Sequence, residues 1–339
     1  MVQSIRACSL AALMVGTLIA CGQPESRAGA SSQPAVWTDP SPHRSEYVMV
    51  NGVRLNCLDW GGAGPALVLI HGLTDSPHIF DDLAPSLSDR FHVVAYARRG
   101  HGHSDAPTGP YNQETLVEDL RLLLDRLGIA RASLLGWSMG GNEITEFAGR
   151  YPDRVDRLVY LEAGYDWSDS TLQKEFPTIS PEASALYSFD AYRQWYRRAW
   201  FGNTPWTPGL EAYLRDITRI DHDGRVQAVP SGAVLDSLVA SWAHSGRNYR
   251  RVRAPALTVY AASFLPIDTD ALDVKRMSHE WEDRYMSAFR RASSERMQRE
   301  MPHVVVRHFP NTAHMSILVA AGDSVVATIR EFLTAASNR

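Results

Sequence analysis

The stretch Gly136-Trp137-Ser138-Met139-Gly140 decides the fold, because it follows an apolar run at 132–135 and precedes an amphipathic stretch at 142–151. The glycines allow a turn too tight for side chains at those positions, which would raise Ser138 above the end of a strand. At the start of the following helix, the backbone N–H of Met139 is expected to face a developing oxyanion. The pattern predicts a strand, a sharp turn with a nucleophilic serine, and a helix. A purely structural Gly–Ser turn is the alternative interpretation.

On both sides of this turn, short apolar runs alternate with amphipathic stretches, which is typical of a mostly parallel sheet flanked by helices. Asn51-Gly52 predicts the turn of a hairpin. The expected strands cover residues 47–50, 53–60, 66–70, 91–95, 132–135, 158–161, 256–261 and 304–309. The expected helices cover residues 80–87, 114–127, 142–151 and 325–333.

Two loops with histidines follow predicted strands. His71-Gly72-Leu73 follows the strand at 66–70, where a second oxyanion donor is expected, and the N–H of Leu73 is the candidate. We expect His71 itself to orient this loop. His314 lies between the last strand and the last helix, at the same sheet edge as Ser138. A serine nucleophile needs an imidazole within hydrogen-bond reach, so His314 is the predicted general base.

These motifs, together with Arg99-Gly100-His101-Gly102-His103-Ser104, resemble the α/β-hydrolase fold family, in the form of a serine hydrolase with an inserted cap. The resemblance covers about residues 47–333. It implies an α/β fold, a Ser–His–acid triad, a two-amide oxyanion hole and no cofactor.

The acid of the triad departs from the usual family pattern, because no carboxylate directly follows the strand at 256–261. Some family members carry the acid after the strand next to the nucleophile, where this chain has Glu162. Either position suits the chemistry, since the acid only orients the imidazole and stabilises its charged form. Glu162 is therefore the preferred acid and Asp268 the alternative, while Asp270 and Asp166 also stay open.

The spacing His101-x-His103-x-Asp105 also resembles part of a metallohydrolase ligand motif. The next residue is alanine instead of histidine, and the glycine-rich loop is already explained by the family's turn. We therefore expect neither a metal site nor a cofactor site.

The alternation of strands and helices stops between residues 165 and 250. This stretch holds 14 of the 32 aromatic residues, which predicts an inserted helical cap over an apolar pocket. The alternative is that these aromatic side chains form a small core of the insert alone. The α/β-hydrolase core then comprises residues 45–164 and 251–339. A second, highly charged insert at 268–301 is expected to be a solvated helical face.

Residues 1–20 combine Arg6 with a 14-residue apolar run, too short for a membrane-spanning helix and typical of a signal peptide. Cys21 follows a small residue, as in bacterial lipoprotein signals, so we expect lipidation at Cys21 and a flexible tether at 21–44. An ordinary signal peptide is the alternative. The expected location is the bacterial cell envelope, at the outer membrane facing the periplasm if the cell has one. Cys57, inside a predicted strand, is expected to be a buried apolar side chain.

Composition excludes several function classes. Hydrophobic residues make up 45% and charged residues 21% of the 339 residues, unlike a disordered or polytopic membrane protein. The formal charge of -4 gives no basic footprint for nucleic acid. The sequence predicts a serine hydrolase that cleaves an ester or related acyl bond of an apolar or aromatic small molecule. The alternative is a non-catalytic lipid-anchored protein that uses the fold to bind a ligand or partner.

Overall fold

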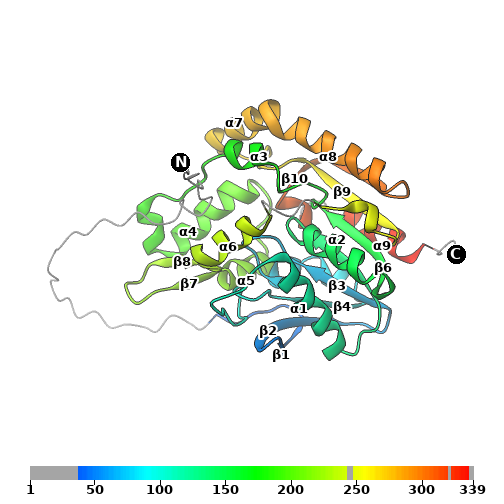
Figure 1. Cartoon of the computed structure of the whole chain (residues 1–339). Coiled ribbons are helices and arrows are strands. Elements are labelled where there is room, and N and C mark those ends of the chain that lie inside the picture. The colour runs from blue at the N-terminus through cyan, green and yellow to red at the C-terminus, as the bar shows by residue number, and fades with distance from the viewer. Residues whose placement is uncertain (1–36, 243–246, 320–321, 336–339) are drawn as a thin grey trace, which may run out of the picture.

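A central eight-stranded sheet organises the chain, with strand order β1-β2-β4-β3-β5-β6-β9-β10 (Figure 1). The computed structural model describes residues 37–242, 247–319 and 322–335. β2 pairs antiparallel with β1 and β4, and the other neighbouring pairs are parallel. The strands are β1 (Arg44–Val50), β2 (Val53–Gly61), β3 (Ala66–Ile70), β4 (His92–Tyr96), β5 (Ala132–Trp137), β6 (Val155–Leu161), β9 (Ala256–Ser263) and β10 (Val305–Ala313). The predicted α/β class, with a mostly parallel sheet flanked by helices, is confirmed.

The central strands are buried on both faces. In β3, Leu67 and Leu69 pack into one apolar cluster, while Val68 and Ile70 pack into another, as the alternation of a strand requires. The first cluster includes residues of α9 (Gly322–Thr334), and the second includes residues of α1 (Gln113–Arg126) and α2 (Gly140–Arg150). The helices therefore cover opposite faces of one sheet (Figure 1).

The predicted hairpin is confirmed, and one predicted helix is wrong. Asn51 and Gly52 have φ values of 48° and 72°, as a type I′ turn between β1 and β2 requires. Residues 80–87 do not form an α-helix but lie across two short 3₁₀ helices, η2 (Pro77–Phe80) and η3 (Ala84–Ser86). Pro85 explains the difference, because it lacks the N–H that an α-helical hydrogen bond needs at that position.

Residues 165–250, the cap segment, lie between β6 and β9. Aromatic residues of this segment join the same cluster as Trp137 of the nucleophile turn, so they do not form a core of their own: Tyr192, Tyr196, Phe201 and Tyr213. Its elements are α3 (Ser170–Glu175), η5 (Ala183–Tyr187), α4 (Phe189–Tyr196), η6 (Arg197–Phe201), α5 (Pro208–Asp216), β7 (Thr218–Ile220), β8 (Val226–Ala228) and α6 (Gly232–Trp242). The charged insert after β9 contains α7 (Leu272–Trp281), the π-helical η8 (Glu282–Met286) and α8 (Ser287–Glu300).

The predicted signal peptide, the lipidation site Cys21 and most of the predicted tether lie outside the described residues. The last tether residues contact the domain, since Trp37 lies over the Arg215 guanidinium and Ser41 donates a hydrogen bond to Asp81. No helix in the described ranges is long and apolar enough to cross a membrane. Cys57 is fully buried, as predicted.

Candidate active site

Ser138 lies at a strained turn between β5 and α2. Its φ is 53°, in the left-handed region of backbone conformation that residues other than glycine rarely adopt. Neighbouring glycines make the turn sterically feasible, because a Cβ atom at Gly140 would lie 2.3 Å from the Ile70 carbonyl oxygen. The backbone N–H of Ser138 donates to the Leu161 carbonyl at 3.2 Å, and the residue is half-buried. The turn therefore has the conformation that the glycine pattern predicts.

His314 and Glu162 form a direct pair. The Nδ1 atom of His314 lies 2.8 Å from Oε2 of Glu162, and both side chains are buried. A carboxylate at this nitrogen fixes the tautomer with the proton on Nδ1, which leaves Nε2 as the basic nitrogen. The structure thus brings together the predicted base and the preferred acid from residues separated by 152 positions.

The sheet places these three residues at one edge. In the parallel register Trp137 lies opposite Leu161, and Leu161 lies opposite Val259, so Ser138 and Glu162 follow neighbouring strand ends. His314 follows β10, and its backbone N–H donates to the Ser263 carbonyl at 3.0 Å. The Trp137 ring stacks on the His314 imidazole with centroids 5.2 Å apart. His314 therefore lies beside the residue that precedes Ser138.

The Glu162 carboxylate has a full set of hydrogen-bond donors. Besides the imidazole, it accepts from the Ala261 backbone N–H at 2.6 Å and from the Tyr165 hydroxyl at 3.1 Å. Glu162 has a φ of 49°, so it is a second residue with a strained backbone at this edge of the sheet. Because a fully buried carboxylate needs such partners, these bonds hold Glu162 in position to orient His314.

Further buried side chains support this pair from the charged insert. Arg290 donates from Nε to the Tyr165 hydroxyl at 3.1 Å and binds Glu282 through both terminal nitrogens at 3.0 and 2.9 Å. Glu282 accepts from the Phe264 backbone N–H at 2.7 Å, and the Phe264 ring stacks on His314 with centroids 4.1 Å apart. Residues 268–301 are helical and largely exposed, as expected, but this insert also contributes a buried ion pair next to His314, which the expectation of a solvated face did not include. Its charged pattern gave no signal of this buried pair, because Glu282 and Arg290 stand among many exposed charges.

The other acid candidates lie elsewhere. Asp268 is exposed and accepts a hydrogen bond from Asn203 at 3.0 Å, and Asp270 lies near the same amide. Asp166 binds Ser168 and Arg296. In the described residues, the carboxylate that contacts His314 is that of Glu162.

The loop expected to carry an oxyanion donor is held by a buried arginine that sequence reasoning missed. Arg98 donates to the carbonyls of His71 and Gly72 and pairs with Glu143 of α2. The Arg98 backbone N–H donates to Nε2 of His71, which leaves Nδ1 to donate to the Gly72 carbonyl. Burial and the Arg98 charge hold the pKa of His71 well below its usual value. His71 is therefore a neutral side chain that orients its loop, as predicted.

The alternative metal motif does not come together. His101 is buried and contacts the Arg99 and Leu73 carbonyls, whereas His103 is exposed and lies near Asp216. Asp105 forms an ion pair with Arg54. The three side chains therefore face different partners, and the Leu73 contact of His101 helps to fix the oxyanion loop.

Asp75, four residues after His71, is a second feature that the sequence reasoning missed. It is almost fully buried and accepts a hydrogen bond from Tyr213 of the cap, whose hydroxyl lies 2.8 Å from that of Tyr196. Burial raises the pKa of the Asp75 carboxyl to about 7, although the Tyr213 hydrogen bond opposes the shift. The Asp75 side chain also occupies the space that a Cβ at Gly72 would need. The carboxyl therefore links the oxyanion loop to the cap.

The predicted oxyanion residues lie beneath cap helix α6. Met139 belongs to a small apolar cluster with Val234 and Leu238 of α6, and Leu73 packs against it together with Trp167. These neighbours would present apolar surface to a group bound at the amides of Leu73 and Met139.

Comparisons with known proteins agree with this architecture. Residues 65–204 match the family model described as alpha/beta hydrolase fold, a range that includes Ser138 and Glu162. An uncharacterized protein of Mycobacterium tuberculosis is 36% identical over 126 residues, which are 37% of each chain. A 2-(acetamidomethylene)succinate hydrolase of Mesorhizobium japonicum is 34% identical over 118 residues, which are 35% of this chain and 42% of the relative. The chain thus matches less than half the length of these relatives.

A solved structure extends the likeness over most of the chain. The crystal structure of E-2-(acetamidomethylene)succinate hydrolase has a TM-score of 0.65 at 23% identity, covering 86% of this chain and all of that one. At that identity the likeness concerns the fold. The protein therefore has the α/β-hydrolase fold, and residues 65–204 are similar to the α/β-hydrolase fold family.

Proposed function

We propose that this protein is a serine hydrolase that cleaves a carboxylic ester or related acyl bond of an apolar or aromatic small molecule through an acyl-enzyme. The observation that carries the proposal is the 2.8 Å contact between His314 Nδ1 and Glu162, at the sheet edge where Ser138 has a φ of 53°. A base held by a buried acid beside a strained serine is what nucleophilic acyl transfer requires.

The proposed reaction has two steps. The Ser138 hydroxyl attacks the substrate carbonyl carbon, and its proton passes to Nε2 of His314, while Glu162 stabilises the imidazolium. The amides of Leu73 and Met139 bind the oxyanion of the tetrahedral intermediate. His314 then protonates the departing alcohol, and the acyl group stays on Ser138. A water molecule deprotonated by His314 attacks this ester, releases the acid and restores the serine hydroxyl.

Two features favour acyl chemistry on an apolar substrate. The residue at the turn is a serine. In the family that this chain resembles, epoxide hydrolases and haloalkane dehalogenases instead attack their substrates with a carboxylate. The apolar cluster of Leu73, Met139, Val234 and Leu238 supplies apolar side chains next to the proposed oxyanion hole. The relatives with a hydrolase name are consistent with this choice of reaction type.

A series of p-nitrophenyl esters of increasing chain length tests the proposal. We expect the wild-type protein to hydrolyse them with a preference for apolar acyl groups. Ser138→Ala should lower kcat by about 10⁴-fold or more. Ser237→Ala, which removes an exposed hydroxyl from α6, is the matched control and should retain wild-type rates. A folded wild-type protein that hydrolyses none of the esters, or equal rates in Ser138→Ala, would contradict the proposal. The first of these outcomes favours the alternative of a non-catalytic binding protein.

We also propose that Cys21 is lipidated and anchors the protein in the bacterial cell envelope. The support is the sequence alone, in which a charged and apolar leader ends at a small residue before Cys21. Wild-type protein should sediment with membranes, while Cys21→Ala should not. Equal membrane association of the two would contradict lipid anchoring at this residue.

A further inference from the structure

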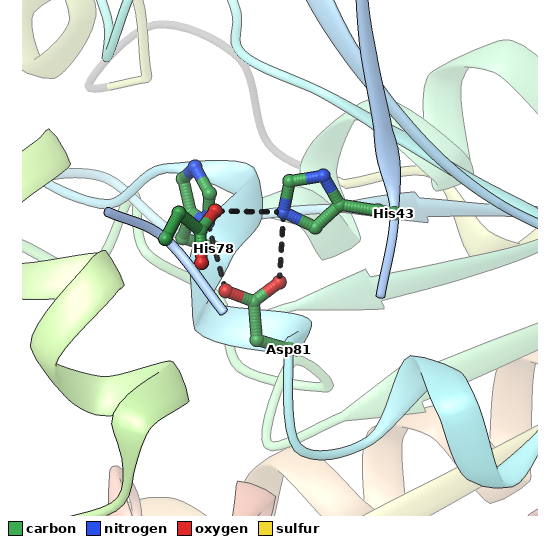
Figure 2. A group of neighbouring side chains, drawn as sticks. His43, His78 and Asp81 are labelled. Carbon is green, nitrogen blue, oxygen red and sulfur yellow. Dashed lines mark hydrogen bonds and ion pairs between the residues drawn. The ribbon is translucent and has the colours of Figure 1, made fainter. Parts of the chain in front are cut away.

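Four metal-ligating side chains from two distant segments meet at the edge of the domain. Asp39 and His43 precede β1, and His78 and Asp81 lie at η2 (Figure 2). One donor atom of each lies within 4.8 Å of the others. Figure 2 shows the Asp81 carboxylate between the side chains of His43 and His78, with dashed lines from it to both.

Several of these buried atoms have no hydrogen-bond partner. The side chains of His43 and Asp81 are 6% and 2% exposed. The Nε2 atom of His43 lies 3.1 Å from Asp39 Oδ2 as an ion-pair contact, but neither ring nitrogen of His43 has a hydrogen bond of good geometry, and Oδ1 of Asp81 also has none. Because burying a polar atom without a hydrogen-bond partner is destabilising, these atoms indicate that the cluster binds a ligand. The unpaired atoms of His43 and Asp81 face each other at 3.6 Å, beyond a good hydrogen bond.

The distances between donors match a tetrahedral metal site. With zinc bonds of about 2.0–2.1 Å, the ligand atoms of a tetrahedron lie about 3.3 Å apart. His43 Nε2 lies 3.1 Å from Asp39 Oδ2 and 3.6 Å from Asp81 Oδ1. His78 Nδ1 lies 3.6 Å from Asp39 Oδ2 and 2.8 Å from Asp81 Oδ2. These four separations fall on both sides of the tetrahedral value and involve both oxygens of Asp81, of which Oδ2 forms a hydrogen bond with His78 in this structure.

The donor chemistry also suits zinc. Imidazoles bind a metal in their neutral form, so two of them with two carboxylates carry a charge of about −2, which a divalent ion neutralises. Imidazole nitrogens favour zinc and related transition metals over magnesium or calcium, which prefer oxygen donors alone. We propose that Asp39, His43, His78 and Asp81 form a binding site for one Zn²⁺ ion.

Neighbouring groups hold the carboxylates as a metal site requires. The Ser41 hydroxyl donates to Oδ2 of Asp81 at 2.8 Å, and the Ser41 backbone N–H donates to Oδ1 of Asp39 at 2.9 Å. Such outer contacts fix the orientation of metal ligands. Four protein ligands leave no open position on a tetrahedral ion, so the site is structural and not catalytic.

The location indicates what the ion stabilises. His78 and Asp81 directly follow the loop that carries Leu73 and Asp75. The adjacent Asp82 accepts a hydrogen bond from Thr207, the N-cap of cap helix α5, at 2.6 Å. A zinc ion at this position fastens residues 39–43 to the base of the oxyanion loop, where the loop meets the cap.

Metal analysis of the full-length chain, purified without a polyhistidine tag and dialysed against ZnCl₂, tests the site. We expect one zinc per chain in the wild type. In titrations of the metal-free protein with ZnCl₂, His43→Ala and Asp39→Asn should weaken zinc binding by about 100-fold or more, since even the loss of an outer-shell group costs 10–100-fold. CoCl₂ should give the intense visible absorption of a four-coordinate ion in the wild type and lose it in both variants.

The exposed group Asp221, His222 and Asp223 supplies a matched control. His222→Ala removes a histidine that also has two neighbouring carboxylates, and it should bind zinc as the wild type does. Asp39 is partly exposed and lies outside the sheet, so Asp39→Asn remains informative if His43→Ala fails to fold. A wild-type chain that retains no zinc, or Asp39→Asn with wild-type affinity and absorption, overturns the proposal.

Discussion

Two buried groups of imidazole and carboxylate side chains in this chain differ in their hydrogen bonding. Glu162 accepts from His314, from the Ala261 N–H and from Tyr165, so its carboxylate is fully paired. In the second group, Oδ2 of Asp81 forms hydrogen bonds with His78 and Ser41, but Oδ1 of Asp81 and the ring nitrogens of His43 have none. In the proposed reaction the paired carboxylate holds one imidazole for proton transfer, whereas in the proposed zinc site the unpaired atoms bind a cation. Histidine and carboxylate side chains thus suit different chemistry according to which of their atoms already have hydrogen-bond partners.

Replacing the acid of the first group should have the largest effect. Glu162→Gln retains the shape of the side chain but loses its charge, so His314 is no longer held in the productive tautomer. We expect kcat on a p-nitrophenyl ester to fall by about 10⁴-fold, as for other triad acids. Asp268→Asn alters an exposed residue and should stay within about twofold of the wild type. The reverse pattern would show that Asp268 is the acid.

The core of this site could be predicted from sequence because its residues follow local patterns. Ser138 stands in a glycine-rich turn after an apolar strand, and His314 follows the last strand. Parallel strands bring such positions to one sheet edge wherever they fall in the chain. Family resemblance favours Glu162 over Asp268, since both residues follow a strand and spacing alone does not separate them.

The parts that sequence reasoning missed depend on contacts between distant segments. Arg98 stands beside Arg99 in the sequence, yet it is Arg98 that binds the His71 loop. His43 lies in a stretch rich in serine and proline, and His78 lies 35 positions later, so no metal-ligand spacing was visible. The i,i+4 pair of Asp39 with His43 and the i,i+3 pair of His78 with Asp81 are the signal that was available.

Asp75 is a third buried carboxylate, whose described hydrogen-bond partner is a tyrosine hydroxyl instead of an imidazole. Burial raises its pKa from 3.8 to about 7, so the folded state favours the protonated acid. This contribution to stability is fully present below the unfolded-state pKa and is lost as pH rises through the folded-state pKa. The free energy of unfolding should therefore fall by up to about 4 kcal/mol between pH 4 and pH 8. Urea unfolding at several pH values should show this decline in the wild type but not in Asp75→Asn. Parallel curves for the two proteins would contradict a raised pKa.

Zinc should stabilise the second group but not the first. At free zinc about 100-fold above its dissociation constant, the wild-type free energy of unfolding should rise by about 2.7 kcal/mol. Asp39→Asn should show no comparable increase, and His222→Ala should match the wild type. Thermal unfolding with and without ZnCl₂ measures the difference. An equal increase in Asp39→Asn would place the stabilising ion elsewhere.

Removing one donor from Glu162 should have the smallest effect. Tyr165→Phe deletes the hydroxyl at 3.1 Å while the Ala261 N–H and His314 contacts remain. Because a hydrogen bond to a charged group is worth about 1.5–3 kcal/mol and two partners persist, kcat should fall about tenfold with little change in KM. Tyr187→Phe, at an exposed tyrosine of the cap segment, is the control. An unchanged kcat in Tyr165→Phe would show that the hydroxyl does not position the acid.

Labelling with a fluorophosphonate probe tests the central claim most directly, because the probe reacts with a serine that an adjacent base activates. Mass spectrometry of the digested wild-type protein should find one adduct per chain, on the peptide that contains Ser138. His314→Ala should react at least about 10³-fold more slowly. A folded wild-type protein that takes up no label, or His314→Ala labelled at the wild-type rate, would contradict the account.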